Sequence, residues 1–518
     1  MVAAGILLSR LVGLIRNRVF AHYFGTSDAA DAFNAAFRIP NFLQNLFGEG
    51  VLSASFIPVY AGLRARGEDH EAERVAGAVA ALLGVVTALL VLLGILLTPW
   101  LIAIIAPGFE GEKREATIRL VRILFPGAGL LVLSAWCLGV LNSHRKFFLS
   151  YAAPVLWNVA IIVSLIAFGR NRAGYPLAEF AAWGSVVGSL FQLGVQLPTV
   201  ARLLEGLRPR LARGSAQVAL VLRNFGPVFV GRGVVQISAY VDTVLASLLP
   251  TGAVAGLSYA QVIYTLPVSL FGMSVSAAEL PAMASAVGTE AERAAQLRAR
   301  LSDGLRQIAF LVVPSAVAFL ALGDVVAGAV YQSGAFTRAM TVYVWGILAG
   351  SAIGLLASTM GRLYSSAFYA MHDTRTPLRF AVLRVGLTIG LGYLFALPLP
   401  RALGVDPRWG AAGLTASAGL AGWIEFLLLR RALNRRIGVT GLAARLLARL
   451  WGAGLAAAAI AWAVRMTVPA AHPILAALAV LGIYGAVYFL VTDRLGIPEA
   501  RAVMRRLRPW ELRTGGAG

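Results

Sequence analysis

Residues 75–109 read VAGAVAALLGVVTALLVLLGILLTPWLIAIIAPGF. The stretch carries no charged side chain, and a helix of about 20 apolar residues is enough to cross the hydrocarbon core of a bilayer. Comparable uncharged runs recur along the chain, at 123–142, 147–169, 180–200, 339–361 and 472–492. The sequence therefore predicts an all-α integral membrane protein.

The composition agrees with this prediction. The chain has 518 residues, of which 58% are hydrophobic and 13% charged, and its mean hydropathy is +0.76. Soluble domains average about 25% charged residues. When shorter or singly charged apolar runs are included, we expect about fourteen transmembrane helices. Three of these expected spans, 1–23, 29–61 and 217–249, contain three charged residues each.

Basic residues divide unequally between the two sets of loops. The net charge of +21 would favour a nucleic-acid partner in a soluble protein. Here the loops of one side, with 287–306 and the C-terminal tail among them, hold 27 Lys and Arg residues, and the loops of the other side hold 8. The positive-inside rule places the richer side and both termini in the cytoplasm. We therefore expect a membrane partner and no nucleic acid.

Two segments of the chain echo each other. Residues 46–61 read LFGEGVLSASFIPVYA and residues 270–284 read LFGMSVSAAELPAMA. Both open with L-F-G, continue with Val, Ser and Ala, and contain a proline near the end. Because they fall in the second and eighth expected spans, they predict a repeat of six spans.

This repeat predicts the domain organisation. We expect an N-lobe at 1–210 (spans 1–6), a C-lobe at 211–436 (spans 7–12), a further helix pair within 437–493 and a basic cytoplasmic tail at 494–518. Two similar lobes in a membrane are typical of a transporter that rocks around a site between them.

Charged side chains interrupt the first span. Residues 6–25, ILLSRLVGLIRNRVFAHYFG, contain Arg10, Arg16 and Arg18. A charge at mid-bilayer costs roughly 2.5–3.5 kcal/mol on insertion scales, and intramembrane charges are usually functional. At helical spacing Arg10 shares a face with Gly13, so this face can line a polar cavity.

Polar residues in other spans extend the candidate site. They are Arg38, Asn41, Gln44 and Glu49 in the second span, Arg232 in the seventh and Arg362 in the tenth. The planar fork of arginine gives two parallel hydrogen bonds to a phosphate. We therefore predict a water-filled cavity that receives an anionic head group.

A structural role is the alternative for these charges. Arginine side chains can reach the membrane interface with their heads, and Arg10 or Arg16 can form an ion pair with Asp31 or Glu49.

Asp242 raises a separate question, because it is a lone acid at membrane depth in the seventh span. It either couples transport to a cation or forms a structural pair with an arginine such as Arg232 or Arg384.

Signatures of catalysis and metal binding are scarce. The chain has no Walker A motif, no G-x-S-x-G and no pair of acids suited to glycosyl transfer. Its single Cys137 excludes a thiolate cluster, and its five histidines lack ligand spacing. We expect a transporter with neither cofactor nor metal site, and a membrane glycosyltransferase is the weaker reading.

Several segments resemble the MurJ (MviN) family of the multidrug/oligosaccharidyl-lipid/polysaccharide (MOP) exporter superfamily. They are SRLVGLIRNRVFAHYFG (9–25), APGF (106–109), YQSGAFT (331–337) and FYAMHDTRTPL (368–378). The resemblance implies two six-helix lobes in a pseudo-twofold, V-shaped arrangement, with a groove for a lipid tail in the pair within 437–493. It also implies a lipid II flippase of the bacterial plasma membrane, which moves the undecaprenyl-pyrophosphate-linked peptidoglycan precursor outward by alternating access. Another polyprenyl-linked glycan or a cationic drug is the alternative cargo, although a basic interior disfavours the drug.

The resemblance also implies roles for individual residues. Arg10 and Arg16 match two substrate-binding arginines of the family's first helix, Asp31 its gating acid, and Glu49 an acid of its second helix. Arg362 matches a basic position of the tenth helix.

The chain departs from the family pattern at four places. Gln44 and Val262 stand where the family has arginines, and Thr265 stands where it has a glutamate. Asp242 resembles the acid of a sodium site, but the partners of that site are missing from LTIGLGYLFAL (387–397). The driving force is thus open between Na⁺, H⁺ and the membrane potential. We expect a monomer that works beside the peptidoglycan-synthesis machinery.

Overall fold

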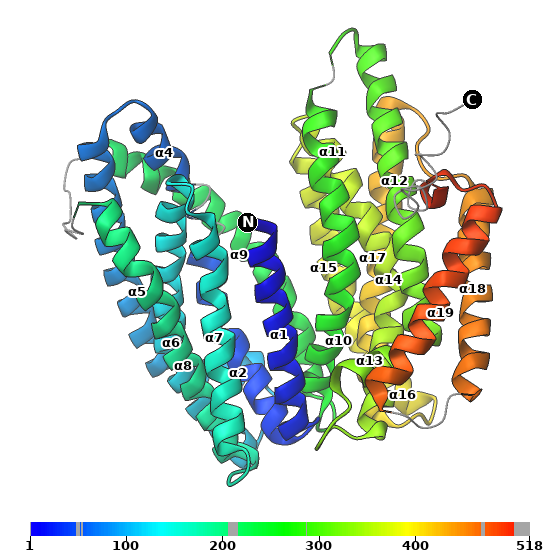
Figure 1. Cartoon of the computed structure of the whole chain (residues 1–518), viewed down its shortest axis with the longest axis horizontal. Helices are drawn as coiled ribbons and strands as arrows, with labels where there is room; N and C mark the ends of the chain where they lie inside the picture. The colour runs from blue at the N-terminus through cyan, green and yellow to red at the C-terminus, as the bar shows by residue number, and fades with distance from the viewer. Residues whose placement is uncertain are drawn as a thin grey trace, which may run out of the picture. The chain divides into compact units, whose positions relative to one another are not determined.

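The computed structural model describes residues 2–47, 52, 55–205, 216–285, 287–467 and 472–501, apart from the side chains of 2–4, 6 and 226–239. Every named element in these ranges is a helix, and the bridge between Ser333 and Phe336 is the single β-type pairing in them (Figure 1). The prediction of an all-α protein is confirmed.

The chain forms two compact units. Unit 1 comprises residues 1–255 and 333–337, and unit 2 comprises 256–332 and 338–518. The helices of unit 1 are α1 (Val2–Phe24), α2 (Asp28–Phe47), α4 (Ile57–Ala65), α5 (Asp69–Ile105), α6 (Gly111–Ser143), α7 (Phe147–Phe168), α8 (Gly174–Leu203) and α9 (Ala216–Ser247). Helix α10 (Ala253–Pro267) begins in unit 1 and ends in unit 2.

The other helices of unit 2 follow in chain order. They are η1 (Val268–Met273), α11 (Ser274–Ala284), α12 (Glu290–Ala321), α13 (Gly323–Tyr331), α14 (Arg338–Ala370), α15 (Arg375–Ala396), α16 (Pro398–Ala402), η2 (Pro407–Trp409), α17 (Gly410–Ile437), α18 (Ala444–Thr467) and α19 (Pro473–Arg494).

Eleven helical segments of the described residues are long and apolar enough to cross a membrane. They coincide with eleven of the expected spans, and α1, α2 and α9 lie in the three expected spans that hold three charged residues each, 1–23, 29–61 and 217–249. The exposed fractions of Leu96 and Trp100 on α5 are 62% and 73%, as suits a surface that contacts lipid. The count of fourteen stays a prediction.

Close helix contacts in unit 1 depend on small residues. Helix α8 packs against α7 and α6, and α1 packs against α7. A Cβ at Gly188 would lie 2.8 Å from the carbonyl oxygen of Trp157, and one at Gly184 would lie 2.6 Å from the Cβ of Ser164. Only glycine allows α7 and α8 to approach this closely.

Helix α9 packs with unit 1, where it contacts α2, α4 and α5. Contacts therefore divide the chain at Ala255, whereas the sequence repeat placed the lobe boundary between 210 and 211. The lobes describe an internal repeat, so this boundary stays a prediction. Much of the first echo segment, 48–51 and 53–54, lies outside the described residues.

Unit 2 is built on α14, which packs against α17 and α12. The last two helices join this frame through tyrosines of α19. Tyr484 Oη donates to the carbonyl of Pro314, and Tyr488 Oη donates to that of Phe310, both at 2.7 Å. The second echo segment runs through η1, a π-helical turn, into α11.

A short segment returns from the second part of the chain to unit 1. Residues 333–337 belong to unit 1, and the amide of Ala335 donates to the carbonyl of His22 at 2.7 Å. Gly334 has a φ of +54°, and a Cβ there would lie 2.5 Å from the same carbonyl oxygen. The YQSGAFT motif thus encodes a tight turn against the end of α1.

Candidate functional site

Arg16 lies beside two stacked aromatic rings of unit 1. Its guanidinium carbon is 5.1 Å from the ring centre of Trp157 on α7 and 5.8 Å from that of Phe37 on α2. These two rings stack on each other at 5.6 Å. Arg16 also donates to the side-chain oxygen of Asn17 at 2.9 Å. Aromatic faces stabilise a guanidinium without neutralising its charge, so these two rings leave the positive charge of Arg16 in place.

The other arginines of α1 are placed differently. Arg10 is exposed and Arg18 is half-buried, and each interacts with another residue. Arg10 therefore lies at the surface and not inside the helix packing.

Asn158 on α7 is a buried polar side chain that the sequence analysis missed. It is 5% exposed, and its amide nitrogen donates to the carbonyl of Pro154 at 3.0 Å. Its Oδ1 makes no hydrogen bond within the described part of the chain and lies 3.9 Å from the position of a Cβ at Gly13. The face of α1 that was predicted to line a polar cavity therefore meets a polar side chain.

The polar residues of α2 lie partly buried. Arg38, Asn41 and Gln44 are all half-buried. Tyr240 on α9 donates its hydroxyl to the carbonyl of Arg38 at 2.7 Å, and the ring of Tyr240 packs edge-on against Phe42. These contacts fix α9 against the part of α2 that carries the predicted site residues.

Asp242 on α9 interacts electrostatically with Arg38 on α2. The sequence analysis offered Arg232 or Arg384 as its structural partner. Arg384 instead donates to Glu425 of α17 at 3.1 Å. The prediction of Arg384 as the partner was therefore wrong, because an acid on the neighbouring helix binds this arginine. The acid and the arginine of the predicted site are therefore electrostatically coupled within unit 1.

Three predicted site residues are not part of this described cluster. Glu49 lies outside the described residues, and so does the side chain of Arg232, although its backbone belongs to α9. Arg362 is exposed on α14 and belongs to unit 2.

Asp31 is buried, with an exposed fraction of 1%, at the start of α2. Its carboxylate accepts a hydrogen bond from Lys113 Nζ at 2.8 Å. It also accepts from the amides of Gly252 and Ala255, both at 2.8 Å. The alternative in which Asp31 pairs with Arg10 or Arg16 is therefore wrong, because Asp31 pairs with Lys113. Asp31 instead caps the first turn of α10, so this acid fixes the beginning of the helix that leads into unit 2.

A second buried acid organises unit 2 and was not predicted. Asp324 on α13 is 1% exposed and accepts hydrogen bonds from Arg338 at the start of α14. Arg465, near the end of α18, donates to both of its oxygens, at 2.6 and 3.0 Å. This bidentate pair ties α18 to α13.

The described residues contain no group of three or more His, Cys, Asp or Glu side chains that could hold a metal ion. The arrangement in unit 1 supplies arginines, amides and aromatic rings, which are groups that can contact an anionic head group.

Comparisons with known proteins identify the family of this chain. The family model described as "Lipid II flippase MurJ" matches residues 20–488. The lipid II flippase MurJ of Burkholderia cenocepacia is 32% identical over 83% of this chain and 82% of its own length. A probable lipid II flippase MurJ of Rhizobium meliloti is 33% identical over 83% of this chain and 78% of its own.

Solved structures share the fold. A lipid II flippase MurJ in an inward closed conformation matches with a TM-score of 0.79 at 23% identity, over 97% of this chain and 99% of that one. An inward-facing multidrug resistance MATE family transporter of the MOP superfamily matches with a TM-score of 0.65 at 16% identity, over 82% and 95%. Since the family model covers most of the chain and the curated relatives exceed 30% identity, the chain belongs to the MurJ family of lipid II flippases.

Proposed function

We propose that this protein translocates lipid II across the membrane by alternating access. The observation that carries the proposal is the family match over residues 20–488, together with relatives that are named lipid II flippases. The protein is a multi-pass membrane transporter and not an enzyme.

Unit 1 supports a specific role for the arginines of α1 in this transport. Arg16 lies beside the stacked rings of Trp157 and Phe37, which orient its guanidinium before a ligand arrives. Arg10 is exposed and can complete the contact with a pyrophosphate. Charge-assisted hydrogen bonds of this kind are about twice as strong as neutral ones. We assign head-group binding to Arg10 and Arg16, with Arg38, Asn41 and Gln44 as further contacts.

Asp242 offers a route for coupling transport to a cation. It interacts electrostatically with Arg38, so a cation at Asp242 would weaken the hold of this acid on the arginine. Asp242→Asn should reduce flipping and leave the protein folded. Unchanged flipping by the wild type across a range of sodium concentrations and pH would contradict the coupling.

The charge distribution supports an orientation with both termini in the cytoplasm of a bacterium. Cys137 is buried, so a Cys137→Ala background permits labelling at single introduced cysteines. Ala299→Cys in α12 should resist a membrane-impermeant thiol reagent applied to whole cells, and Ala173→Cys, just before α8, should react. Both residues are exposed, and the reverse pattern would invert the topology.

The decisive test of lipid II transport is replacement of the native flippase. A bacterium depleted of its own flippase should regain outer-leaflet lipid II and growth when it expresses this chain. Normal membrane levels without outer-leaflet lipid II would contradict the proposal. Reconstituted monomers, without the peptidoglycan-synthesis machinery, should also flip lipid II if the protein acts alone.

A further inference from the structure

Helix α17 presents an apolar stripe on one side. Leu420, Ile424 and Leu427 are 39%, 37% and 52% exposed, and their spacing of four and three residues puts them on one helix face. Helix α17 packs against α14 and α15. In a membrane the exposed stripe contacts acyl chains.

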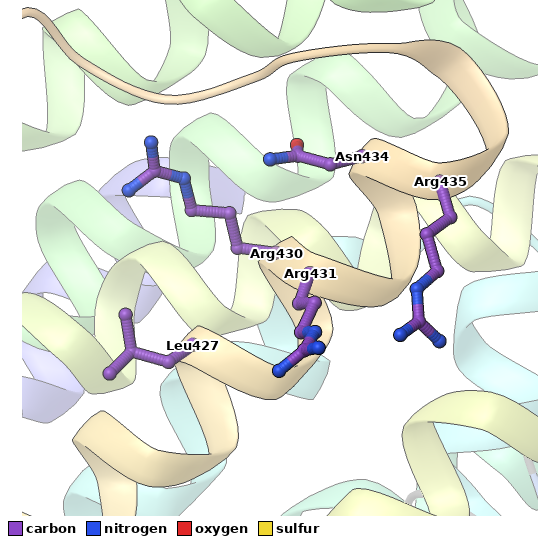
Figure 2. A pocket seen from close by; sticks show the side chains of 5 residues that line it. All are labelled: Leu427, Arg430, Arg431, Asn434 and Arg435. Atoms are coloured by element: carbon purple, nitrogen blue, oxygen red, sulfur yellow. The ribbon is translucent and has the colours of Figure 1, made fainter.

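The stripe continues into two arginines at the end of the helix. Arg431 and Arg435 follow Leu427 at four and eight residues, and both are exposed. Together with Leu427, Arg430 and Asn434 they line a recess of about 430 Å³ (Figure 2). Within the described part of the chain, neither Arg431 nor Arg435 has a hydrogen bond or an ion pair through its guanidinium.

The other polar residues of the recess are already engaged in structure. Arg430 Nε donates to the carbonyl of Thr440 at 3.0 Å, and the side-chain oxygen of Asn434 accepts from the amide of Thr440 at 2.9 Å. Figure 2 shows Arg430 extending above the helix, whereas the guanidinium groups of Arg431 and Arg435 lie below it. The turn after α17 is thus fixed, and two arginines remain available on one side.

Arg436, which follows Arg435, differs from it because Arg436 has structural partners. It forms an ion pair with Asp373 at 2.6 Å and lies over the ring of Phe368 at 5.3 Å. Among the residues that the structure describes, Arg430 and Arg436 have structural partners, whereas Arg431 and Arg435 have none and continue the apolar stripe.

We propose that Arg431 and Arg435 bind the phosphate of an anionic phospholipid whose acyl chains lie along Leu420, Ile424 and Leu427. Four residues of helix rise about 6 Å, so Arg431 stands one turn beyond the last apolar residue, at the level where a head group follows its chains. Guanidinium groups form paired hydrogen bonds with phosphate oxygens. Basic recesses at the cytoplasmic ends of transmembrane helices bind such head groups.

The competing explanation is that these arginines serve only topology and the dipole at the end of the helix. In that case their removal would change the affinity for anionic lipid no more than the removal of any two cytoplasmic charges. A matched pair exists on α12, where Arg293 and Arg300 are exposed and lie in the cytoplasmic loop at 287–306.

The test measures phosphatidylglycerol binding to the purified full chain by native mass spectrometry, with phosphatidylcholine as the uncharged comparison. R431Q/R435Q should weaken phosphatidylglycerol binding on the order of tenfold, because it removes two positive charges that attract the anionic head group. R293Q/R300Q should leave it unchanged. Leu427→Asn should weaken it with both arginines present, and inorganic phosphate should not compete, because the site needs the acyl chains.

Several outcomes would overturn the proposal. They are equal losses in the two double variants, no loss in R431Q/R435Q, and competition by inorganic phosphate at millimolar concentration. R431K/R435K retains the charge and should bind with intermediate affinity, which distinguishes loss of the site from loss of folding. The measurement involves no lipid II, so its result is independent of the proposed transport.

Discussion

The guanidinium of Arg16 lies 5.1 Å from the ring centre of Trp157, and Trp157 in turn donates its indole N–H to Ser185 of α8 at 3.1 Å. A cation of α1 is therefore oriented by a ring that α7 and α8 hold in place. This relationship connects the position of Arg16 to the packing of α7 and α8.

The first prediction concerns Arg16 itself. Arg16→Ala should cost about 1.5–3 kcal/mol of lipid II binding, on the order of tenfold to a hundredfold, because a hydrogen bond to a charged group is lost. Arg16→Lys keeps the charge and loses the fork, so it should be partly active. Binding of lipid II to purified variants checks both, with Arg18→Ala as the control that should retain binding. Full binding by well-folded Arg16→Ala would contradict the assignment.

The second prediction concerns the ring beneath Arg16. Trp157→Leu should weaken lipid II binding by about 0.5–2 kcal/mol, the range of a cation–π contact. If the ring orients Arg16, the loss in Trp157→Leu/Arg16→Ala should be smaller than the sum of the single losses. A double-mutant cycle on the binding constant provides the measurement, and strict additivity would show that the ring does not act through Arg16.

The third prediction concerns Asp31. Asp31→Ala removes the more buried of the two carboxylates that bind Lys113 and leaves the amides of Gly252 and Ala255 without this acceptor. Breaking a buried ion pair typically costs about 3–5 kcal/mol. Thermal unfolding in detergent should show a large loss of stability for Asp31→Ala. The control is Asp28→Ala, because Asp28 binds the same lysine but has a side chain 49% exposed. Equal losses would refute the capping role.

The fourth prediction concerns pH and Asp373, which lies between α14 and α15. The amide and hydroxyl of Thr376 and the guanidinium of Arg436 lower the pKa of Asp373 to about 2. Its unfolded pKa is higher, so the charged form stabilises the fold fully above about pH 4. This contribution is lost as the pH falls through 3.8 toward 2.

The measurement compares melting temperatures of the wild type and Asp373→Ala. The difference should be constant from about pH 7 to pH 5 and should shrink as the pH falls below about 4. Asp373→Asn keeps the cap to Thr376 and should lose less stability than Asp373→Ala, whose lost cap alone costs about 1 kcal/mol. A difference in melting temperature that grows as the pH falls would contradict the prediction.

The sequence predicted the helices well and their partners less well. Uncharged runs such as 75–109 leave no alternative to a membrane helix, and α5 covers that run as far as Ile105. The interaction of Asp242 with Arg38 and the pair of Arg384 with Glu425 were not predicted. Their partners are distant in the chain, and nothing in local spacing indicates which helices become neighbours.

Asn158 and Asp324 show a second limit of sequence reasoning. Each is a single polar residue beside apolar ones, which has no periodic signal. Asn158 could have been suspected because it lies in a long apolar span, where an amide needs a partner. Asp324 stands in an apparently apolar run, and its partner Arg465 lies far along the chain.

The return of residues 333–337 to unit 1 has a consequence for biogenesis. The carbonyl of His22 receives its hydrogen bond from Ala335, so unit 1 cannot be completed when its last continuous residue, Ala255, leaves the ribosome. The ribosome must first synthesise residues 256–332 of the other unit, which takes about 4–16 s at translation rates of about 5–20 residues per second. During this interval the end of α1 lacks the contact with residues 333–337. A truncated N-terminal half would therefore remain structurally incomplete however long it was allowed to fold.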